Sequence, residues 1–176
     1  MSEIKIFTDA SQHEESKMGF FAYRIEIPKY NVEIVNSGRL GIIKDSNEGE
    51  AKTILKAMKH LHDEGWPLIA DQTTLITDSD FSHRLYKNTK EVSGKIKKQF
   101  EEVLSEFSML CRVWNVFKNM SIKVVKSHTN TKSKDIQMNR WCDIECRRQR
   151  RAYTKGENEL VPIPYIIENQ PKLKAA

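Results

Sequence analysis

Two carboxylates close the most strand-like segments of this sequence. Asp9 ends the alternating run IKIFTD, and Asp78 ends a shorter run of the same kind, TTLITD. In open sheets that combine strands and helices, ligands gather at the carboxyl ends of the strands. We therefore expect both side chains to lie at one edge of a sheet, where they can reach a ligand.

Two further acids are placed to join them. Glu50 precedes Ile54 by four residues, so it shares the inward face of the helix that the apolar spacing predicts. Asp143 lies in a basic helix that we expect to begin near Met138 or Asn139. Because this helix follows the last expected strand, its first turns can direct Asp143 toward the sheet.

Carboxylates that converge in this way repel one another and lose their hydration unless cations compensate them. Magnesium is a hard ion that prefers carboxylate oxygens and water, and pairs of such ions about 3.5 to 4 Å apart are used to cut phosphodiesters. One ion then activates water and the other stabilises the leaving oxygen. The four acids therefore predict a site for two Mg²⁺ ions, with Mn²⁺ as a substitute, and phosphodiester cleavage as its reaction.

The elements that must position these acids follow from hydrophobic periodicity. We expect strands at residues 3–8, 19–27, 31–40, 73–78 and 121–127. We expect helices from a cap at Ser46 or Asn47 to a stop at Gly65, and then at residues 79–87, at 91–118, where a break near Gly94 stays open, and from about 138 onward, after a polar loop at 128–136. This order predicts an α/β fold whose five-stranded mixed sheet, an antiparallel three-strand meander plus two parallel strands, is flanked by helices.

Length and composition indicate one soluble domain. The 176 residues suit a single hydrophobic core, which we place at residues 1–155, followed by a C-terminal tail at 156–176 that packs along the surface. The net charge of +5 suits a polyanionic partner. The sequence shows neither a signal pattern nor an apolar run that could span a membrane, so we expect a cytoplasmic monomer without a membrane partner.

The three cysteines, Cys111, Cys142 and Cys146, predict no disulfide framework, because their number is odd and no signal pattern precedes them. Cys142 and Cys146 lie one helical turn apart in the last expected helix. The sequence places no third and fourth zinc ligand at a matching spacing, so we expect no structural metal there.

The sequence resembles type 1 ribonuclease H, within the wider ribonuclease H-like fold. The resemblance runs through the motifs IFTDAS, SNEGEAKTILKAMKHL, LITDSDFSHRL, VKSHTN and NRWCDIECRR, from residue 4 to about residue 150. It implies that the metal-binding acids are Asp9, Glu50, Asp78 and Asp143. It also implies that His128 matches a mobile histidine that assists water activation or product release. The expected activity is cleavage of the RNA strand of RNA–DNA hybrids by two Mg²⁺ ions, leaving 3′-hydroxyl and 5′-phosphate ends.

The same resemblance suggests contacts to the nucleic acid. Ser11 and Asn47 are assigned to nucleic-acid binding, although the family often has a second asparagine where this chain has Ser46. Three lysines at the start of the 91–118 helix are interpreted as phosphate contacts: Lys95, Lys97 and Lys98. Such contacts add affinity without sequence preference.

Several alternatives stay open at this point. Glu48 competes with Glu50, because an acid in the first turn of a helix complements the helix dipole whatever its function. Asp135, in the loop beside His128, is a competing carboxylate. Where many family members carry glutamine two residues after the third acid, this chain has Asp80. The fold is therefore also compatible with a nuclease that acts on DNA or structured RNA, or with a nucleic-acid-binding module that has lost catalysis.

Overall fold

The computed structural model describes residues 2–87, 92–118, 120–126 and 133–163. Its centre is a five-stranded sheet in the order β3-β2-β1-β4-β5. The strands β1 (Glu3–Gln12), β2 (Met18–Ile27) and β3 (Val32–Ile42) form an antiparallel meander, and β4 (Gln72–Thr77) and β5 (Ser121–Val124) continue the sheet in parallel with β1. The expected mixed sheet is confirmed, and β1 lies at its centre.

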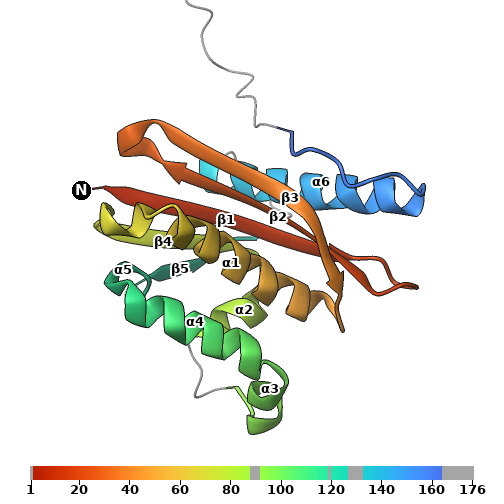
Figure 1. Cartoon of the computed structure of the whole chain (residues 1–176), viewed down its shortest axis with the longest axis horizontal. Helices are drawn as coiled ribbons and strands as arrows, with labels where there is room; N and C mark the ends of the chain where they lie inside the picture. Colours follow the sequence, from red (N-terminus) through yellow and green to blue (C-terminus); the bar gives the residue numbers. More distant parts are fainter. Residues whose placement is uncertain (1, 88–91, 119, 127–132, 164–176) are drawn as a thin grey trace, which may run out of the picture.

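Helices cover both faces of this sheet (Figure 1). One face carries α1 (Ser46–Asp63), α2 (Asp80–Lys87) and α4 (Glu101–Val113), whereas α6 (Lys134–Thr154) lies on the other face. Shorter elements complete the chain: η1 (Pro28–Tyr30), η2 (Trp66–Leu68), α3 (Gly94–Gln99) and α5 (Asn115–Lys118). The site must therefore be built where the two layers of helices reach the same strand ends.

Alternation along β1 sorts its side chains between the two layers. Ile4 and Ile6 join the larger hydrophobic cluster under α1, whereas Phe7 joins a second cluster with Met138 and Cys142 of α6. Successive residues of a strand point to opposite faces. Asp9, two residues after Phe7, therefore leaves the strand on the α6 side.

Two helix starts differ from the sequence-based expectation. The cap of α1 is Asp45, not Ser46 or Asn47: its extended backbone lets the side chain accept a hydrogen bond from the Glu48 amide at 2.9 Å. The α6 helix begins at Lys134, one turn before Met138. Polar residues in that first turn hid the helix from a periodicity argument, which depends on apolar spacing.

The long helix expected at 91–118 is three helices instead of one. The backbone leaves helical geometry at Phe100 (φ −110°) and again at Trp114 (φ −125°, ψ 109°). Both rings pack against the core, with Phe100 buried and Trp114 half-buried. Hydrophobic spacing continued across these breaks, so the sequence pattern could not show them.

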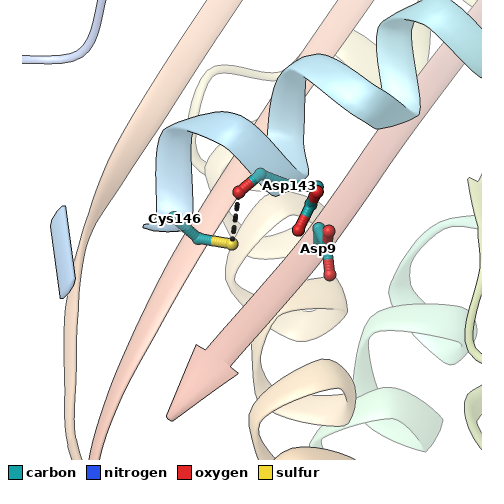
Figure 2. A group of neighbouring side chains, drawn as sticks. All are labelled: Asp9, Asp143 and Cys146. Atoms are coloured by element: carbon teal, nitrogen blue, oxygen red, sulfur yellow. Dashed lines mark hydrogen bonds between the residues drawn. The ribbon is translucent and has the colours of Figure 1, made fainter. Parts of the chain in front are cut away.

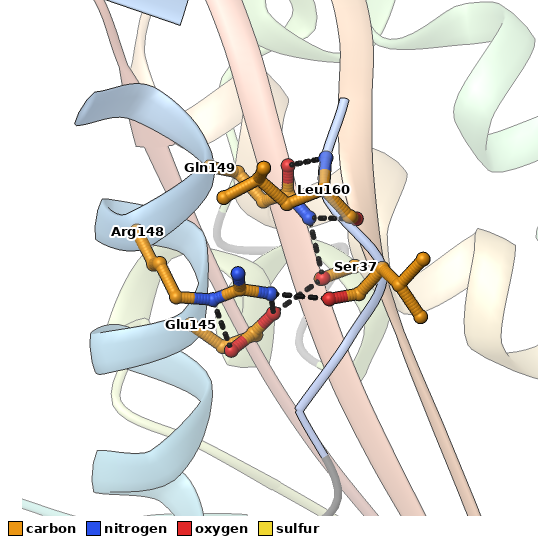
Figure 3. Close-up of polar contacts among 6 residues, drawn as sticks. Ser37, Glu145, Arg148, Gln149 and Leu160 are labelled. Carbon is orange, nitrogen blue, oxygen red and sulfur yellow. Dashed lines mark hydrogen bonds and ion pairs between the residues drawn. The ribbon is translucent and has the colours of Figure 1, made fainter. Parts of the chain in front are cut away.

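The described start of the C-terminal segment packs on α6 and β3. Gln149 donates to the Leu160 carbonyl at 2.6 Å and accepts from the Leu160 amide at 3.0 Å, and Arg148 donates to the Val161 carbonyl (Figure 3). Division of the chain into a domain at 1–155 and a tail at 156–176 stays a prediction. In the part of the chain that the structure describes, no helix is long and apolar enough to cross a membrane.

Candidate active site

Three of the expected acids meet beside the central strand β1, where its parallel neighbour β4 ends. One carboxylate oxygen from each of Asp9, Glu50 and Asp78 lies within 4.8 Å of the others. Asp9 comes from β1, Asp78 directly follows the neighbouring parallel strand β4, and Glu50 comes from the first turns of α1. The expected meeting of Asp9 and Asp78 is confirmed, but Asp9 does not end its strand: β1 continues to Gln12, paired with β2, and only β4 stops beside Asp9.

A close approach of α1 to β1 brings the third acid, Glu50, to the site. The Ala10 amide donates to Asp9 Oδ1 at 2.7 Å and to Glu50 Oε1 at 3.0 Å, so one strand amide holds both carboxylates. Gly49 allows this approach: a Cβ there would lie 3.0 Å from Ile43 Cδ1 and 3.2 Å from Ala10 Cβ, closer than most real contacts. Glycine therefore lets the helix start sit directly against the strand.

The α6 helix brings a second group to the opposite side of Asp9. Ligand atoms of Asp9, Asp143 and Cys146 all lie within 4.8 Å of one another, and Figure 2 shows the two carboxylates facing each other beside the thiol. Arg147 Nε forms an ion pair with Asp143 Oδ1 at 2.7 Å. Asp9 is shared by both groups, so the four acids form one continuous cluster.

Burial makes this cluster costly to ionise. It raises the pKa of Asp9 to about 7, and the charges of Asp78 and Asp143 add to the effect. The hydrogen-bonding interactions of Asp9 with Glu50 and the Ala10 amide act in the opposite direction. Burial, followed by the neighbouring charge of Asp9, also raises the pKa of Glu50 well above its usual value. Without a cation, the cluster therefore tends to hold protons near neutral pH.

One atom of the cluster is a direct test of whether a cation fits. Glu50 is only 8 % exposed, and its buried Oε2 atom has no hydrogen-bond partner among the described residues. Buried carboxylate oxygens are normally satisfied, because leaving them unpaired costs free energy. A hard divalent cation held by carboxylate oxygens would satisfy this atom and compensate the charges around it. The donor set thus fits such an ion.

The competing acids lie elsewhere. Glu48 accepts from the Lys44 amide at 2.7 Å and pairs with Lys52 at 2.7 Å, so it completes the start of α1 at the surface. Asp135 pairs with Lys123 at 2.7 Å and with Lys5 at 3.6 Å. Neither belongs to the carboxylate groups around Asp9.

The remaining predicted site residues are dispersed or outside the described part. Ser11 Oγ donates to the Cys146 carbonyl at 3.4 Å, and Asn47 is exposed in the first turn of α1. Lysines 95, 97 and 98 lie on α3; the last two line a surface groove that α4 continues. His128 lies outside the described residues. The roles of all these residues stay predictions.

Two residues near the acids were not expected from the sequence. Cys146 and Arg147 follow Asp143 by three and four positions, which places them on the same side of the helix as this acid. That spacing was visible in the sequence. It became informative only when the structure placed Asp9 against the same part of α6.

Comparisons with known proteins give one family match and many structural matches. The profile of the family described as RNase H matches residues 1–151. A search of the curated proteins finds no match. At least 154 chains of solved structures match, and three of these are described here.

RNase H1 from the halophilic archaeon Halobacterium salinarum NRC-1 is 11% identical, with a TM-score of 0.64; the alignment covers 85% of this chain and 98% of that one. The N-terminal RNase H domain of rv2228c from Mycobacterium tuberculosis is 11% identical, with a TM-score of 0.61 and coverage of 89% and 99%. LC11-RNase H1, isolated from compost and solved with an RNA/DNA hybrid, is 16% identical, with a TM-score of 0.59 and coverage of 76% and 92%. At such identities the likeness shows a shared fold.

Proposed function

The chain belongs to the RNase H family, and from this premise we propose that it is a metal-dependent endonuclease that hydrolyses the RNA strand of RNA–DNA hybrids. The products would carry 3′-hydroxyl and 5′-phosphate ends. The observation that carries the proposal is the convergence of four acids around Asp9, including a buried carboxylate oxygen of Glu50 that lacks a partner among the described residues. A protein that only bound nucleic acid would have no use for such a cluster, because it destabilises the fold without a cation.

The hybrid as substrate is supported by family and by one neighbour. LC11-RNase H1, which shares the fold, was solved in complex with an RNA/DNA hybrid. The net charge of +5 suits a polyanionic substrate of this kind. The proposed substrate of this chain is therefore an RNA–DNA hybrid.

The ions would be Mg²⁺, with Mn²⁺ as a substitute, held by the four acids Asp9, Glu50, Asp78 and Asp143. When bound, two such ions supply an activated water and charge stabilisation at the leaving oxygen. Each acid is presented by a separate element: β1, the start of α1, the end of β4, and α6. A site supported by packed strands and helices holds its groups in place more accurately than one supported by loops.

The chain's own groups then have distinct tasks. Asp9, on the central strand, links the two halves of the cluster, and the Ala10 amide orients its carboxylate together with that of Glu50. Asp143 pairs with Arg147, and this guanidinium would be available to a substrate phosphate if Asp143 held a cation. His128 is proposed to move a proton to or from the reacting water or product.

Substrate positioning is assigned to polar and basic residues around the cluster. Ser11 and Asn47 would contact the hybrid near the acids, and Lys95, Lys97 and Lys98 would contact phosphates from α3. We further propose that the protein acts as a cytoplasmic monomer. The segment after residue 156 would support the domain from outside, in keeping with the contacts of Leu160 on α6.

The test is cleavage of an end-labelled RNA–DNA hybrid with Mg²⁺, beside the same RNA alone, duplex RNA and duplex DNA, each with a chelator control. We expect cleavage only in the RNA strand of the hybrid, abolished by the chelator. Cutting of duplex DNA or structured RNA instead would assign the site to a nuclease of different specificity. No cleavage of any substrate with Mg²⁺ or Mn²⁺ would indicate a binding module.

A further inference from the structure

A thiol stands within reach of two of the acids. Cys146 Sγ and carboxylate oxygens of Asp9 and Asp143 lie within 4.8 Å of one another, and the cysteine is fully buried (Figure 2). The thiol donates to the Asp143 carbonyl at 3.4 Å, a weak bond within one turn of α6. Sulfur and oxygen ligands therefore face the same small space from two elements.

A second observation points to a missing cation at Asp9, although Arg147 already pairs with Asp143. The Glu50 carboxyl shares the Ala10 amide with Asp9, and its Oε2 atom is buried without a hydrogen-bond partner in the described part of the chain. The Asp9 carboxylate thus has the unsatisfied Glu50 oxygen and the Cys146 thiol as neighbours. A cation at Asp9 would compensate the buried negative charge and could be bound by these neighbours.

The ligand types distinguish this side of the cluster from a pure magnesium site. Magnesium takes oxygen ligands, whereas a cysteine sulfur favours Zn²⁺ and other thiophilic ions. From standard bond lengths, a tetrahedral Zn²⁺ ion would need its sulfur and oxygen ligands about 3.6 Å apart. Atoms already within 4.8 Å reach that spacing by side-chain movements of about 1 Å.

We propose that Asp9, Asp143 and Cys146 form a binding site for a thiophilic divalent cation of the Zn²⁺ and Co²⁺ class, which blocks magnesium-dependent cleavage. Binding forms a metal–sulfur bond, and the thiol proton passes to solvent. Binding of the cation would also break the ion pair between Arg147 and Asp143, because Arg147 and the cation would compete for the same carboxylate. The binding rests on geometry alone; the inhibition rests on the proposed function, since the ion occupies two of the acids assigned to magnesium.

The binding test is a titration of the intact protein with Co²⁺ in the absence of nucleic acid, followed by the sulfur-to-cobalt charge-transfer absorption in the near ultraviolet. We expect the band in the wild type and in Cys142→Ala, and its loss in both Cys146→Ala and Cys146→Ser. Cys142 is the matched control, because it is fully buried one turn earlier on the same helix but is not in the ligand group. Circular dichroism confirms that each variant is folded, and the serine variant preserves the size of the side chain.

The inhibition test adds Zn²⁺ to magnesium-dependent hybrid cleavage. Relative to its own uninhibited rate, Cys146→Ala should need at least about tenfold more Zn²⁺ for half inhibition, because even residues that only support metal ligands change affinity by that factor. Absence of the cobalt band in the wild type, or its persistence in both Cys146 variants, would overturn the site. A cobalt band that depends on Cys146 in a protein that cleaves nothing would leave the binding site standing and reject the nuclease proposal. Equal zinc sensitivity of wild type and Cys146→Ala would overturn the inhibition.

Discussion

Two of the three acids on α6, Asp143 and Glu145, lie two residues apart and in opposite situations. Glu145 is only 2 % exposed, yet Ser37 Oγ donates to it at 2.8 Å, and Arg148 donates to it at 2.6 and 3.1 Å (Figure 3). Asp143, in contrast, pairs with Arg147 but also faces the buried carboxylate of Asp9 (Figure 2). One helix thus contributes to a satisfied polar network and to a cluster of like charges.

This difference indicates a structural role for Glu145 and a chemical role for the cluster around Asp9. Around Glu145, the Ser37 hydroxyl and the Arg148 guanidinium donate to both carboxylate oxygens, and the Gln149 amide extends the network from Ser37 to Leu160. Around Asp9, the strongest neighbours are other acids. Natural folds accept such local conflict at functional sites and resolve it elsewhere. We therefore expect changes at Glu145 to act on stability and changes in the Asp9 cluster to act on turnover.

The largest expected effect is loss of cleavage in Asp78→Asn. The amide keeps the size of the side chain but removes a charge that the ions require. Hybrid cleavage should fall at least about a hundredfold, beyond the usual effect of residues that only support metal ligands. Asp80→Asn is the matched control, because Asp80 is exposed and pairs with Arg84 on α2. Retained cleavage in Asp78→Asn, or equal loss in both variants, would contradict the assignment.

Glu145→Ala should break the satisfied network and destabilise the fold. Truncation leaves the buried Ser37 hydroxyl and the Arg148 guanidinium without their shared acceptor. The free energy of unfolding in urea should fall by on the order of 2 to 3 kcal/mol, the usual range for a buried group left unpaired. Gln137→Ala, at an exposed position of the same helix, should change it far less. If both variants had equal stability, the network would not be the structural element described here.

Asp9→Asn should raise the free energy of unfolding, whereas Glu145→Ala lowers it. We expect this gain for the protein without metal at alkaline pH. The pKa of Asp9 is raised to about 7 by burial, so its favourable contribution is complete below about pH 4, the unfolded value, and is lost as pH rises through 7. Asparagine avoids that loss, worth on the order of 4 kcal/mol at pH 8 and little at pH 4.

This effect is measured by urea unfolding at pH 8 and pH 4 in the presence of a chelator. In a second experiment without chelator, Mg²⁺ should stabilise the wild type more at pH 8 than at pH 4, because it favours the ionised cluster. The same Mg²⁺ should have little effect on Asp9→Asn. A stability gain of this variant that was independent of pH would show that ionisation of Asp9 is not the cause.

The smallest expected effect is that of Gly49→Ala. The added Cβ would meet Ile43 Cδ1 at 3.0 Å and Ala10 Cβ at 3.2 Å, so either these side chains or α1 itself must move by a few tenths of an ångström. Displacing Glu50 by so little should lower kcat only a few-fold, since misplacement by a full ångström costs about a hundredfold. Stability should change by less than about 1 kcal/mol, because alanine also favours the helix. Unchanged kcat would show that this close approach does not position Glu50.

Much of this arrangement follows from the sequence. Strand alternation and helical crossovers gave the sheet, and the position of Asp9 and Asp78 at strand ends predicted their meeting. The breaks at Phe100 and Trp114 could not be predicted, because the same apolar spacing continues through them. The α6 helix began earlier than expected because its first turn, with Asp135, is polar and pairs with lysines of the sheet.

The details of the cluster depend on packing that no local pattern reveals. Cys146 lies one helical turn from Cys142, but the sequence offers this pair no further zinc ligands at a matching spacing. Its neighbours in the structure are Asp9, from the opposite end of the chain, and Asp143, within one turn. For Glu50 and Glu48, the helical face already favours Glu50 in the sequence, and the approach of α1 to β1 places it against Asp9.

The central claim is that the buried carboxylate cluster binds divalent cations for hybrid cleavage. The most direct measurement is the number of Mn²⁺ ions bound by the protein with a non-cleavable RNA–DNA hybrid, from electron paramagnetic resonance of free Mn²⁺, with the hybrid alone subtracted. We predict two ions for the wild type, and fewer for Asp9→Asn with the fold intact. No bound Mn²⁺ beyond that of the hybrid, or the same number in both proteins, would contradict the account.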